Sequence, residues 1–515
     1  MRGRAWTADE ANQRLASLSA PESIRAVAKE VIENLKTTRP TSKPHLTAQQ
    51  RLEWLLEFPW EANTERRGLR EVEEAFAKSI LNQEEAKEKV LESLSLYFVD
   101  RESAAPVLCL TGPSGTGKTL IARTMASALG RKLVQIRIGG LRTEIDVFGH
   151  NAPGQIAQAF RRAQAIDPVV LIEDIHRVKS DVALTALLDS LDPMGDAFED
   201  RYLGVPIRLD KAIFIMTCQS VTELPCGWQG RIRVIPLDSY VDEEKVEIAT
   251  KHLVPELAER AGIAPPKFSA ATMSHLIRNY TREPGVSELA SRLETVLRKL
   301  SLRRLRGETV PEKVTRETIK ALLGPDYYLS IAPFNGGVGM VNGLAETSMG
   351  GEIMPIEIVA TPGEGNISLT GNLGNVLRES AQIAHTWVKT RADRLRIPYE
   401  RFNQVDLHIH LPEGACPKDG PSAGLGFALA IASVMTGRRV RNGFSITGEL
   451  TVHGDAIAIG GLAEKLSAAR REGVRKVIIP EKNLSDLYWI RPAVLEKLDI
   501  VPVQTMDDVL SIALC

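Results

Sequence analysis

Residues 107–130, "VLCLTGPSGTGKTLIARTMASALG", decide the fold of the first half of the chain. An apolar run typical of a buried strand leads into a glycine-rich loop, and a helical pattern follows. Residues 112–119, "GPSGTGKT", match GxxxxGK[ST] in the strand, loop and helix context that gives this pattern its physical meaning. A glycine-rich turn without a ligand is the minor alternative. The stretch therefore predicts an α/β domain that binds nucleotide phosphates.

The residues of this phosphate loop have separate roles. Backbone N–H groups around Gly112, Gly115 and Gly117, together with the helix N-terminus, would hold the phosphates. Lys118 would reach the β- and γ-oxygens, and Thr119 would ligate magnesium. ATP or ADP with magnesium is therefore the expected cofactor of this domain.

Hydrolysis of a bound nucleotide needs further groups, normally an Asp-Glu pair at the end of the next core strand. Here the strand ends "LIEDIHR", which gives Glu173 and then Asp174, the reverse of the usual order. The exchange moves each carboxylate by roughly 1 Å, and a misplacement of that size can cost about 100-fold in rate. We expect slow or absent turnover, with magnesium held by Thr119 and Asp174 only when nucleotide binds.

The chain divides by periodicity into four segments. Residues 64–238 alternate helical patterns with the apolar runs "PVLCLTG", "KLVQIRI", "PVVLIED" and "KAIFIMT", as expected for a parallel sheet covered by helices. Residues 1–63 form a helical arm with a Pro/Ser/Thr-rich break at 39–47. Residues 239–324 are helical almost throughout, and 325–515 are typical of an α+β domain. We predict a multi-domain α/β and α+β protein.

Composition excludes several classes of protein. The 64 basic and 65 acidic residues give a net charge of -1, which does not favour a dedicated binder of nucleic acid or of a membrane surface. The five cysteines are widely spaced and form no CxxC, so neither a disulfide framework nor a zinc site is indicated. No apolar run reaches the roughly 18 residues needed to cross a bilayer. We expect a cytoplasmic protein.

A second candidate site begins at residues 417–426, "PKDGPSAGLG". Ser422 stands before a long apolar helix that ends at Gly437, and Gly420 and Pro421 shape the entry turn. Serine is a preferred N-cap residue, so this stretch alone leaves two interpretations of Ser422, a helix cap or a nucleophile.

The motif "IGGLAEKLSAARREG" at 459–473 supplies a base for such a nucleophile. Lys465 falls in the first turns of a helix, where burial and the helix dipole both favour the neutral amine. The pKa of a lysine must fall from about 10.4 toward neutrality for this role, and Ser-Lys pairs are a known variant of the catalytic triad. The other interpretation is a solvated lysine paired with Glu464 or Glu449.

The order of "EWLLEFPW", "GPSGTGKT", "LIEDIHR", "YTREPGV", "GPSAG" and "GGLAEK" resembles the Lon protease family from residue 50 to the C-terminus. The resemblance implies an AAA+ module joined to a Ser-Lys protease domain, usually in a hexameric ring. It favours Ser422 as nucleophile and Lys465 as base. It further implies that the Thr447 hydroxyl, in "ITGEL", orients the lysine and that Glu346, in "AETSMGGE", supports the site.

The expected mechanism is attack of the Ser422 hydroxyl on a peptide carbonyl, with Lys465 taking the proton and returning it to the leaving amine. A water molecule then resolves the acyl-enzyme. Backbone N–H groups from Gly420 to Ser422, at a helix N-terminus, would stabilise the oxyanion. Asp419 directly precedes this loop, and we expect it to control the shape of the loop or access to it.

Several residues depart from the family pattern. The polar Asn expected at sensor 1 is replaced by Gln219, and Ser287 stands at the sensor-2 arginine, although Arg231 remains at the arginine-finger position. After His150 the chain continues "NAPGQI", without the aromatic residue that grips a threaded polypeptide. We also expect the large N-terminal substrate-binding domain of long bacterial Lon chains to be absent. With the inverted carboxylate pair, these departures resemble the ATP-independent LonC branch.

His408 and His410, in "DLHIHLPEG", raise the alternative of a Ser-His-Asp triad or of a zinc site. Both alternate along a strand and so point to one face. A solvated or hydrogen-bonded pair is the better interpretation, because the Ser-Lys pair already supplies nucleophile and base. A third zinc ligand in a recognisable spacing is missing.

Three functions remain open at this point. The favoured one is a serine endopeptidase that cleaves unfolded polypeptides without ATP hydrolysis or any required cofactor, with the AAA+ module as the scaffold of a homo-hexameric ring. The second is a conventional ATP-driven Lon protease, which the intact "GPSGTGKT" keeps open. The third is a non-proteolytic chaperone or binding ring, against which the intact Ser422 and Lys465 motifs argue. No nucleic-acid or membrane partner is indicated.

Overall fold

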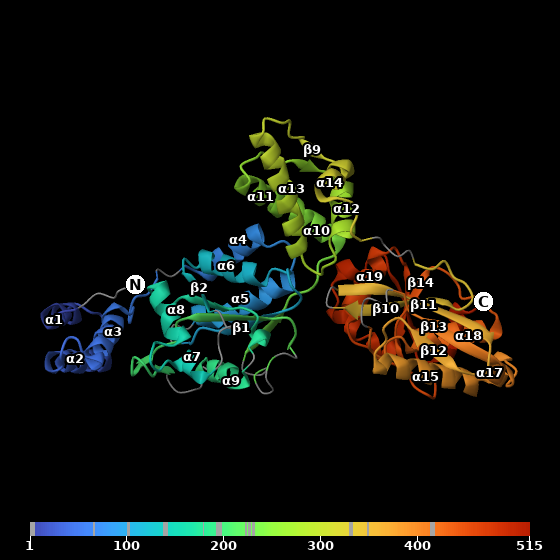
Figure 1. Ribbon diagram of the computed structural model, residues 1–515, viewed down its shortest axis with the longest axis horizontal. Coiled ribbons are helices and arrows are strands. Elements are labelled where there is room, and N and C mark those ends of the chain that lie inside the picture. The colour runs from blue at the N-terminus through green and yellow to red at the C-terminus, as the bar shows by residue number, and fades with distance from the viewer. Residues whose placement is uncertain are drawn as a thin grey trace. The chain divides into compact units, whose positions relative to one another are not determined.

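The structure, a computed structural model, confirms a multi-domain protein of α/β and α+β parts (Figure 1). It describes residues 6–64, 67–99, 103–136, 143–178, 180–191, 198–221, 224, 228, 232–328, 333–347, 350–412 and 418–515. The chain forms two compact units, Met1–Asp238 and Ser239–Cys515. The first unit contains the arm and the phosphate loop, and the second contains Ser422 and Lys465.

The arm consists of three helices, α1 (Ala8–Ala16), α2 (Glu22–Thr37) and α3 (Lys43–Glu57). The break predicted at 39–47 is too long, because α3 already begins at Lys43. The Ser42 side chain caps this helix, and Pro44 lies in its first turn, where the N–H that proline lacks has no helical partner to lose.

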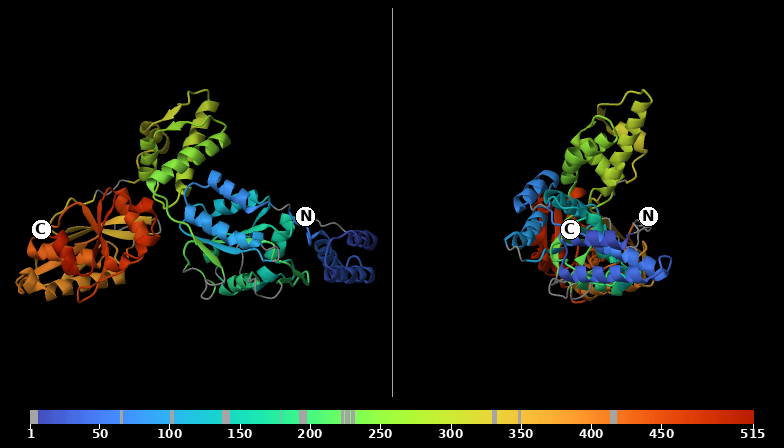
Figure 2. Two further views of the ribbon diagram at one scale, coloured as in Figure 1. Left: turned by 180° about the vertical axis from the view of Figure 1, so that it is seen from behind. Right: turned by 90° about the vertical axis from the view of Figure 1, so that its left-hand side faces the viewer.

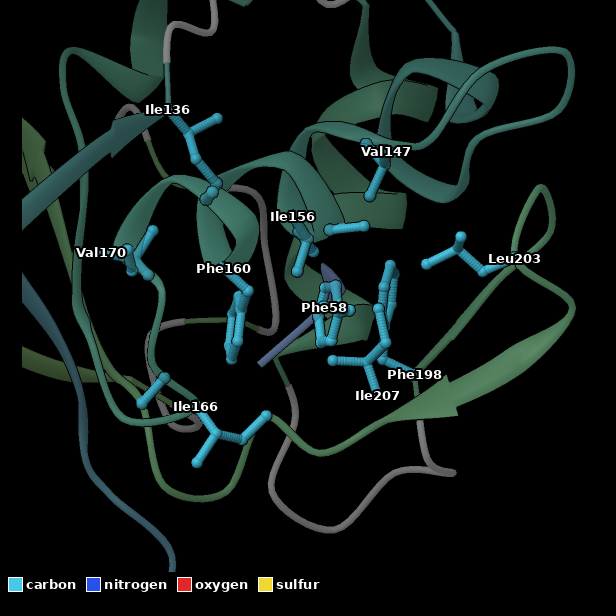
Figure 3. Close-up of a cluster of buried hydrophobic side chains, with 14 of the residues drawn as sticks. Phe58, Ile136, Val147, Ile156, Phe160, Ile166, Val170, Phe198, Leu203 and Ile207 are labelled. Carbon is cyan, nitrogen blue, oxygen red and sulfur yellow. The ribbon is translucent and has the colours of Figure 1, made fainter. Parts of the chain in front are cut away.

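The end of α3 packs against the nucleotide-binding-like domain. Phe58 lies in a buried apolar cluster beside Phe160, with ring centroids 6.4 Å apart and ring planes nearly parallel at 10° (Figure 3). The Arg161 guanidinium pairs with the carboxylate of Glu53 at 3.1 Å and also with that of Glu57. The arm therefore shares the hydrophobic core of the first unit.

The core of the first unit is a parallel five-stranded sheet in the order β2-β3-β6-β1-β7. Its strands are β1 (Val107–Thr111), β2 (Leu133–Ile136), β3 (Val169–Ile172), β6 (Ile213–Cys218) and β7 (Arg233–Pro236). Its other elements are α4 (Leu69–Ser79), α5 (Glu84–Val99), α6 (Lys118–Ala128), α7 (Glu144–Phe148), α8 (Gln155–Ala163), η2 (Ile175–Arg177), α9 (Asp181–Ser190) and the hairpin of β4 (Phe198–Asp200) and β5 (Val205–Ile207). Strands fall within all four predicted runs, whereas β4, β5 and β7 were not predicted.

The second unit begins with the predicted helical part, which Figures 1 and 2 show as one bundle. Its elements are α10 (Asp242–Ile248), the π-helical η4 (Ala249–Leu253), α11 (Val254–Arg260), α12 (Ala270–Tyr280), α13 (Ser287–Leu305), α14 (Arg316–Leu323) and the short parallel pair of β8 (Lys267–Phe268) and β9 (Lys313–Val314). A buried cluster that includes Leu276, Leu293 and Leu297 forms its core.

The rest of this unit is built on a mixed seven-stranded sheet in the order β12-β13-β11-β10-β14-β17-β18. Its strands are β10 (Met340–Thr347), β11 (Gly350–Pro362), β12 (Ile367–Thr370), β13 (Val405–His410), β14 (Phe444–Ile446), β17 (Lys476–Pro480) and β18 (Asp499–Val503), and a small separate sheet joins β15 (Glu449–Leu450) to β16 (Ala456–Ile457). The helices are α15 (Asn375–Thr390), α16 (Ala392–Leu395), α17 (Arg401–Gln404), α18 (Gly424–Thr436), α19 (Leu462–Arg471), η5 (Glu481–Asn483), η6 (Asp486–Trp489), α20 (Pro492–Leu495) and α21 (Met506–Ala513).

Two features of this fold position the candidate site. Residues 424–435 of α18 are all buried, as expected for a helix that is apolar on every side. Strands β10 and β14 are parallel neighbours, with Gly343 opposite Ile446. Glu346 and Thr447, which follow these residues, therefore lie toward the same end of the sheet.

No helix in the described part of the chain combines the length and the apolar character needed to cross a membrane.

Candidate active site

The phosphate loop has a conformation that only glycines adopt easily. Gly112, Gly115 and Gly117 have φ values of 138°, 78° and 104°. A Cβ atom on Gly112 would also overlap the Leu237 carbonyl oxygen. The loop between β1 and α6 is thus shaped so that its backbone stays uncovered, which fits the phosphate groups of a nucleotide.

The side chains that follow the loop contact the ends of β1 and β3. Lys118 Nζ donates hydrogen bonds to the carbonyl oxygens of Gly112 at 2.6 Å and Pro113 at 2.7 Å. Thr119 Oγ1 donates to Glu173 Oε1 at 2.7 Å. We expected Thr119 and Asp174 to share the magnesium ion, but the carboxylate in contact with Thr119 is that of Glu173, whose longer side chain spans the distance from β3 to α6. The loop and Thr119 fit a magnesium-nucleotide, and the sharing of magnesium by Thr119 and Asp174 stays a prediction.

Asp174 has a different environment. Its backbone is left-handed, with φ 53° and ψ 54°, and its N–H donates to Thr217 Oγ1 at 3.0 Å. Its carboxylate pairs with the Arg177 guanidinium, with Oδ2 and Nε 3.2 Å apart. Asp174 stands where the residue that polarises water is expected, and its partner there is an exposed arginine.

The structure describes most of the other residues expected to sense nucleotide or to grip a threaded chain, but not Arg231. Gln219 is exposed after β6, and its backbone oxygen accepts a hydrogen bond from the Gly112 N–H at 3.2 Å. Ser287 is the exposed first residue of α13. Arg231 lies outside the described residues. The segment from His150 to Gly154 is a tight turn whose last N–H donates to the buried Asp200 carboxylate at 2.8 Å.

Ser422 lies two residues before the first residue of α18. The N-cap position of this helix is Ala423, and no side chain makes a capping hydrogen bond there. The backbone oxygen of Ser422 accepts hydrogen bonds from the Gly448 N–H at 2.8 Å and from Thr447 Oγ1 at 3.4 Å. Among the described residues the hydroxyl of Ser422 forms no hydrogen bond. The cap interpretation is therefore wrong, and the loop joins Ser422 to the end of β14.

Asp419 connects the serine loop to another helix. Its Oδ1 accepts hydrogen bonds from the Leu377 N–H at 3.0 Å, in the first turn of α15, and from the Gly420 N–H at 2.9 Å. Gly374 occupies the N-cap position of α15, and a Cβ atom on it would overlap the Asp419 side chain. Asp419 thus caps α15 from a distant part of the sequence. Gly420, with φ 126°, makes the turn that follows.

Lys465 lies in the first turns of α19, as predicted. The residue is only 3% exposed, and its Nζ donates to the Gly460 carbonyl oxygen at 2.8 Å. Burial lowers the pKa of Lys465, while the carboxylates of Glu346 and Glu464 raise it in part. Burial is the larger effect, because it disfavours the charged ammonium. The alternative interpretation, a solvated lysine, is wrong.

The seven-stranded sheet brings Ser422 and Lys465 toward one of its ends. Glu346, on β10, contacts the site of Lys465 because its carboxylate lies against Gly461, where a Cβ atom would overlap it. Thr447, which directly follows β14, the neighbour of β10, hydrogen-bonds the backbone of Ser422. The end of the sheet therefore holds a half-buried serine, a buried lysine and backbone N–H groups at a helix N-terminus. This set can perform nucleophilic attack, proton transfer and oxyanion stabilisation.

Comparisons with known proteins match three regions of the chain to family models. Residues 313–515 match the Lon protease (S16) C-terminal proteolytic domain, residues 260–314 match the Lon protease AAA+ ATPase lid domain, and residues 108–236 match the ATPase family associated with various cellular activities. The chain belongs to the Lon protease family. Lon membership agrees with the motifs at both candidate sites.

Curated Lon proteins match nearly all of this chain. It is 37% identical over 508 residues to the Lon protease of Desulforamulus reducens, covering 96% of this chain and 63% of the relative. It is also 37% identical to the Lon protease of Koribacter versatilis, covering 98% and 64%, and to Lon protease 2 of Syntrophobacter fumaroxidans, covering 97% and 65%. The chain thus spans less than two thirds of the length of these relatives.

The histidine pair has a structural explanation within this Lon fold. His408 Nε2 and His410 Nδ1 both hydrogen-bond to Thr370 Oγ1, at 2.9 and 2.7 Å, across the parallel pair of β12 and β13. The prediction of a hydrogen-bonded pair on one face of a strand is confirmed. In the described part of the chain no three His, Cys, Asp or Glu side chains gather as metal ligands.

Sequence analysis did not identify two glycines that let elements meet at the site. A Cβ atom on Gly351, in β11, would overlap the Glu464 carbonyl oxygen next to Lys465, so glycine allows the strand to lie against the start of α19. Gly374 similarly admits the Asp419 side chain. The glycine pair in "MGGE" is a weak signal for the first contact, and nothing local to Gly374 indicates the second.

Proposed function

We propose that the chain is a serine endopeptidase in which Ser422 is the nucleophile and Lys465 the base. The observation that carries the proposal is the burial of Lys465 at the end of the sheet that also holds Ser422, with its pKa lowered. Burial lowers the pKa and so enlarges the fraction of neutral amine, which is the form that accepts the serine proton.

The reaction has two stages on these residues. Ser422 Oγ attacks the peptide carbonyl carbon, its proton passes to the neutral Lys465 amine, and the resulting ammonium returns that proton to the leaving amine as the peptide bond breaks. A water molecule then attacks the acyl-enzyme carbonyl carbon and gives a proton to Lys465. The ammonium returns that proton to Ser422 Oγ as the ester bond breaks, which releases the acid product and restores the serine. The Gly460 carbonyl holds the amine in place. The backbone N–H of Ser422 stabilises the oxyanion, since Pro421 has no N–H and that of Gly420 already donates to Asp419.

The proposed substrates are unfolded polypeptides, and the proposed assembly is a homo-hexameric ring in which the AAA+ module is a scaffold. Three observations support cleavage without ATP turnover, as in the LonC branch. Asp174 is paired with Arg177, the pair of Glu173 and Asp174 is inverted, and the turn from His150 to Gly154 contains no Phe, Tyr or Trp. A bound magnesium-nucleotide would stabilise the ring through Lys118 without being consumed.

The second candidate function is ATP-dependent proteolysis. The positive φ angles of the phosphate-loop glycines favour it, since the loop keeps the conformation that phosphates need. A non-proteolytic ring is a weaker candidate, because the serine, the buried lysine and the donors around them occupy one end of the sheet.

Degradation assays test the peptidase proposal. Wild-type protein is expected to cleave a disordered protein and to leave a stable globular protein intact, whereas Ser422→Ala and Lys465→Met each lose at least about 1,000-fold in rate. The matched controls are Ser511→Ala, which removes a surface hydroxyl that bonds only within its helix, and Lys476→Met, which removes an exposed lysine. Retention of cleavage by Ser422→Ala, or loss in the controls, would refute the assignment.

A further inference from the structure

The segment 239–244, which leads into α10, is built into the protease part of the second unit. Val241 is 7% exposed and belongs to the same buried cluster as Leu462 and Leu466 of α19. The helix that carries Lys465 therefore packs against a residue from outside 313–515, the range matched to the proteolytic domain.

An ion pair fixes α10 to the chain that follows α19. Glu244 accepts hydrogen bonds from both terminal nitrogens of Arg491, with Nη1 at 2.6 Å and Nη2 at 3.2 Å. The two side chains are only 11% and 17% exposed. Arg491 also donates to the Ser239 carbonyl oxygen. A bidentate, mostly buried pair restricts orientation as well as distance, so it sets the position of α10 relative to this chain segment.

A second ion pair reaches α19 itself. Glu243 Oε1 lies 3.0 Å from Arg470 Nη2, and Arg470 is in the last turn of the helix that carries Lys465. The next residue, Arg471, donates to the Gly351 carbonyl oxygen at 2.9 Å. The first turn of α19 thus lies against Gly351, and its last turn is held by the hydrogen bonds of Arg470 and Arg471.

The joint between α10 and α19 is not completely filled. A cavity of about 60 Å³ lies between them, and its walls include Lys245, Glu464, Ser467 and Arg471. Across this pocket the ion pairs, and not close packing, make the contact between α19 and α10. Loss of a pair leaves room for the helix to shift.

We propose that Glu243 and Glu244 are positioning residues for Lys465. They act through Arg470 and Arg491, and they keep α19 where the lysine amine is shielded from water beside β10. The inference rests on the Ser422 and Lys465 peptidase proposed above. It makes a segment outside the proteolytic domain a determinant of the strength of the base.

Glu244→Gln and Glu243→Gln test this role. The substrate is a short unstructured fluorogenic peptide, and the readout is kcat/KM as a function of pH. We expect Glu244→Gln to lower kcat/KM near pH 7.5 by about tenfold or more and to move the acid limb of the profile to higher pH, because a shifted α19 admits water and the pKa of Lys465 rises toward its ordinary value. The carboxylates that face the amine, Glu346 on β10 and Glu464 on α19, stay unchanged. Glu243→Gln has the same effect but smaller, since Glu243 is exposed.

The matched control is Glu247→Gln, on the same helix, which removes an exposed ion pair with Lys251. We expect its profile to equal the wild-type profile. Arg491→Lys, which keeps the charge but loses the bidentate geometry, is a second variant in case Glu244→Gln does not fold. A lower kcat with an unmoved acid limb, or an unchanged kcat/KM, would overturn the inference. Active wild type and inactive Ser422→Ala would then leave the proposed peptidase intact, whereas equal activity of those two proteins would end both proposals.

Discussion

Lys465 experiences opposing influences on its protonation. Burial lowers its pKa, and the carboxylates of Glu346 and Glu464 raise it. The residue is deprotonated, and able to act as a base, above its folded-state pKa. Activity should therefore rise with pH through that value and reach its plateau below 10.5, the ordinary pKa of lysine.

Removing one carboxylate tests this balance. Glu346→Gln takes away a negative charge that favours the ammonium form, so the pKa of Lys465 falls further and the acid limb of kcat/KM moves to lower pH. Peptide cleavage measured across pH 5 to 10 checks the direction, with the exposed Glu364→Gln as control. Movement of the limb to higher pH, opposite to this sign, would mean that Glu346 acts through something other than its charge.

Local sequence patterns predicted the elements that carry the site. Apolar runs and helical spacing predicted β1, β3, β6 and α18, whose end at Gly437 follows from the left-handed C-cap glycine. The short strands β4 (FED), β5 (VPI) and β7 (RVIP) were missed because charged residues or proline interrupt their apolar pattern, whereas β3 (VVLI) is apolar throughout. The position of Lys465 on α19 was predicted, but its burial was not readable from periodicity alone.

The contact of Asp419 with α15 joins residues 42 positions apart in sequence, so no local pattern indicates it. The same is true of the contact between Thr119 and Glu173, 54 positions apart, which sequence analysis did not predict. Chemistry of this kind depends on how strands and helices meet, and only the folded chain defines it.

Asp419→Ala tests the link between the serine loop and α15. Loss of the acceptor at the Leu377 N–H should lower the free energy of unfolding by about 1 kcal/mol. We also expect kcat to fall while KM changes little, because the loop that carries Ser422 is no longer bonded to α15. Asp508→Ala is the matched control, since Asp508 caps the start of α21 with the same kind of hydrogen bond. Equal kcat values in the two variants at similar stability would show that Asp419 has no role in the site beyond stability.

The two compact units of the molecule differ in the state of their candidate sites. The phosphate loop keeps the backbone geometry for a nucleotide, and Thr119 still contacts a carboxylate. Asp174, which we expect to polarise water, is paired with Arg177, and the segment where we expect a gripping residue is a short turn. The proposed peptidase residues Ser422 and Lys465, in contrast, lie toward one end of the sheet. This contrast is the basis for proposing that cleavage is separate from ATP hydrolysis.

Degradation of a disordered protein by the wild type, with and without Mg-ATP and with Ser422→Ala as blank, tests that claim most directly. The account predicts equal rates under both conditions, with no cleavage by the blank. Cleavage that requires Mg-ATP would contradict it, and would mean that Glu173 and Asp174 support turnover in their inverted order.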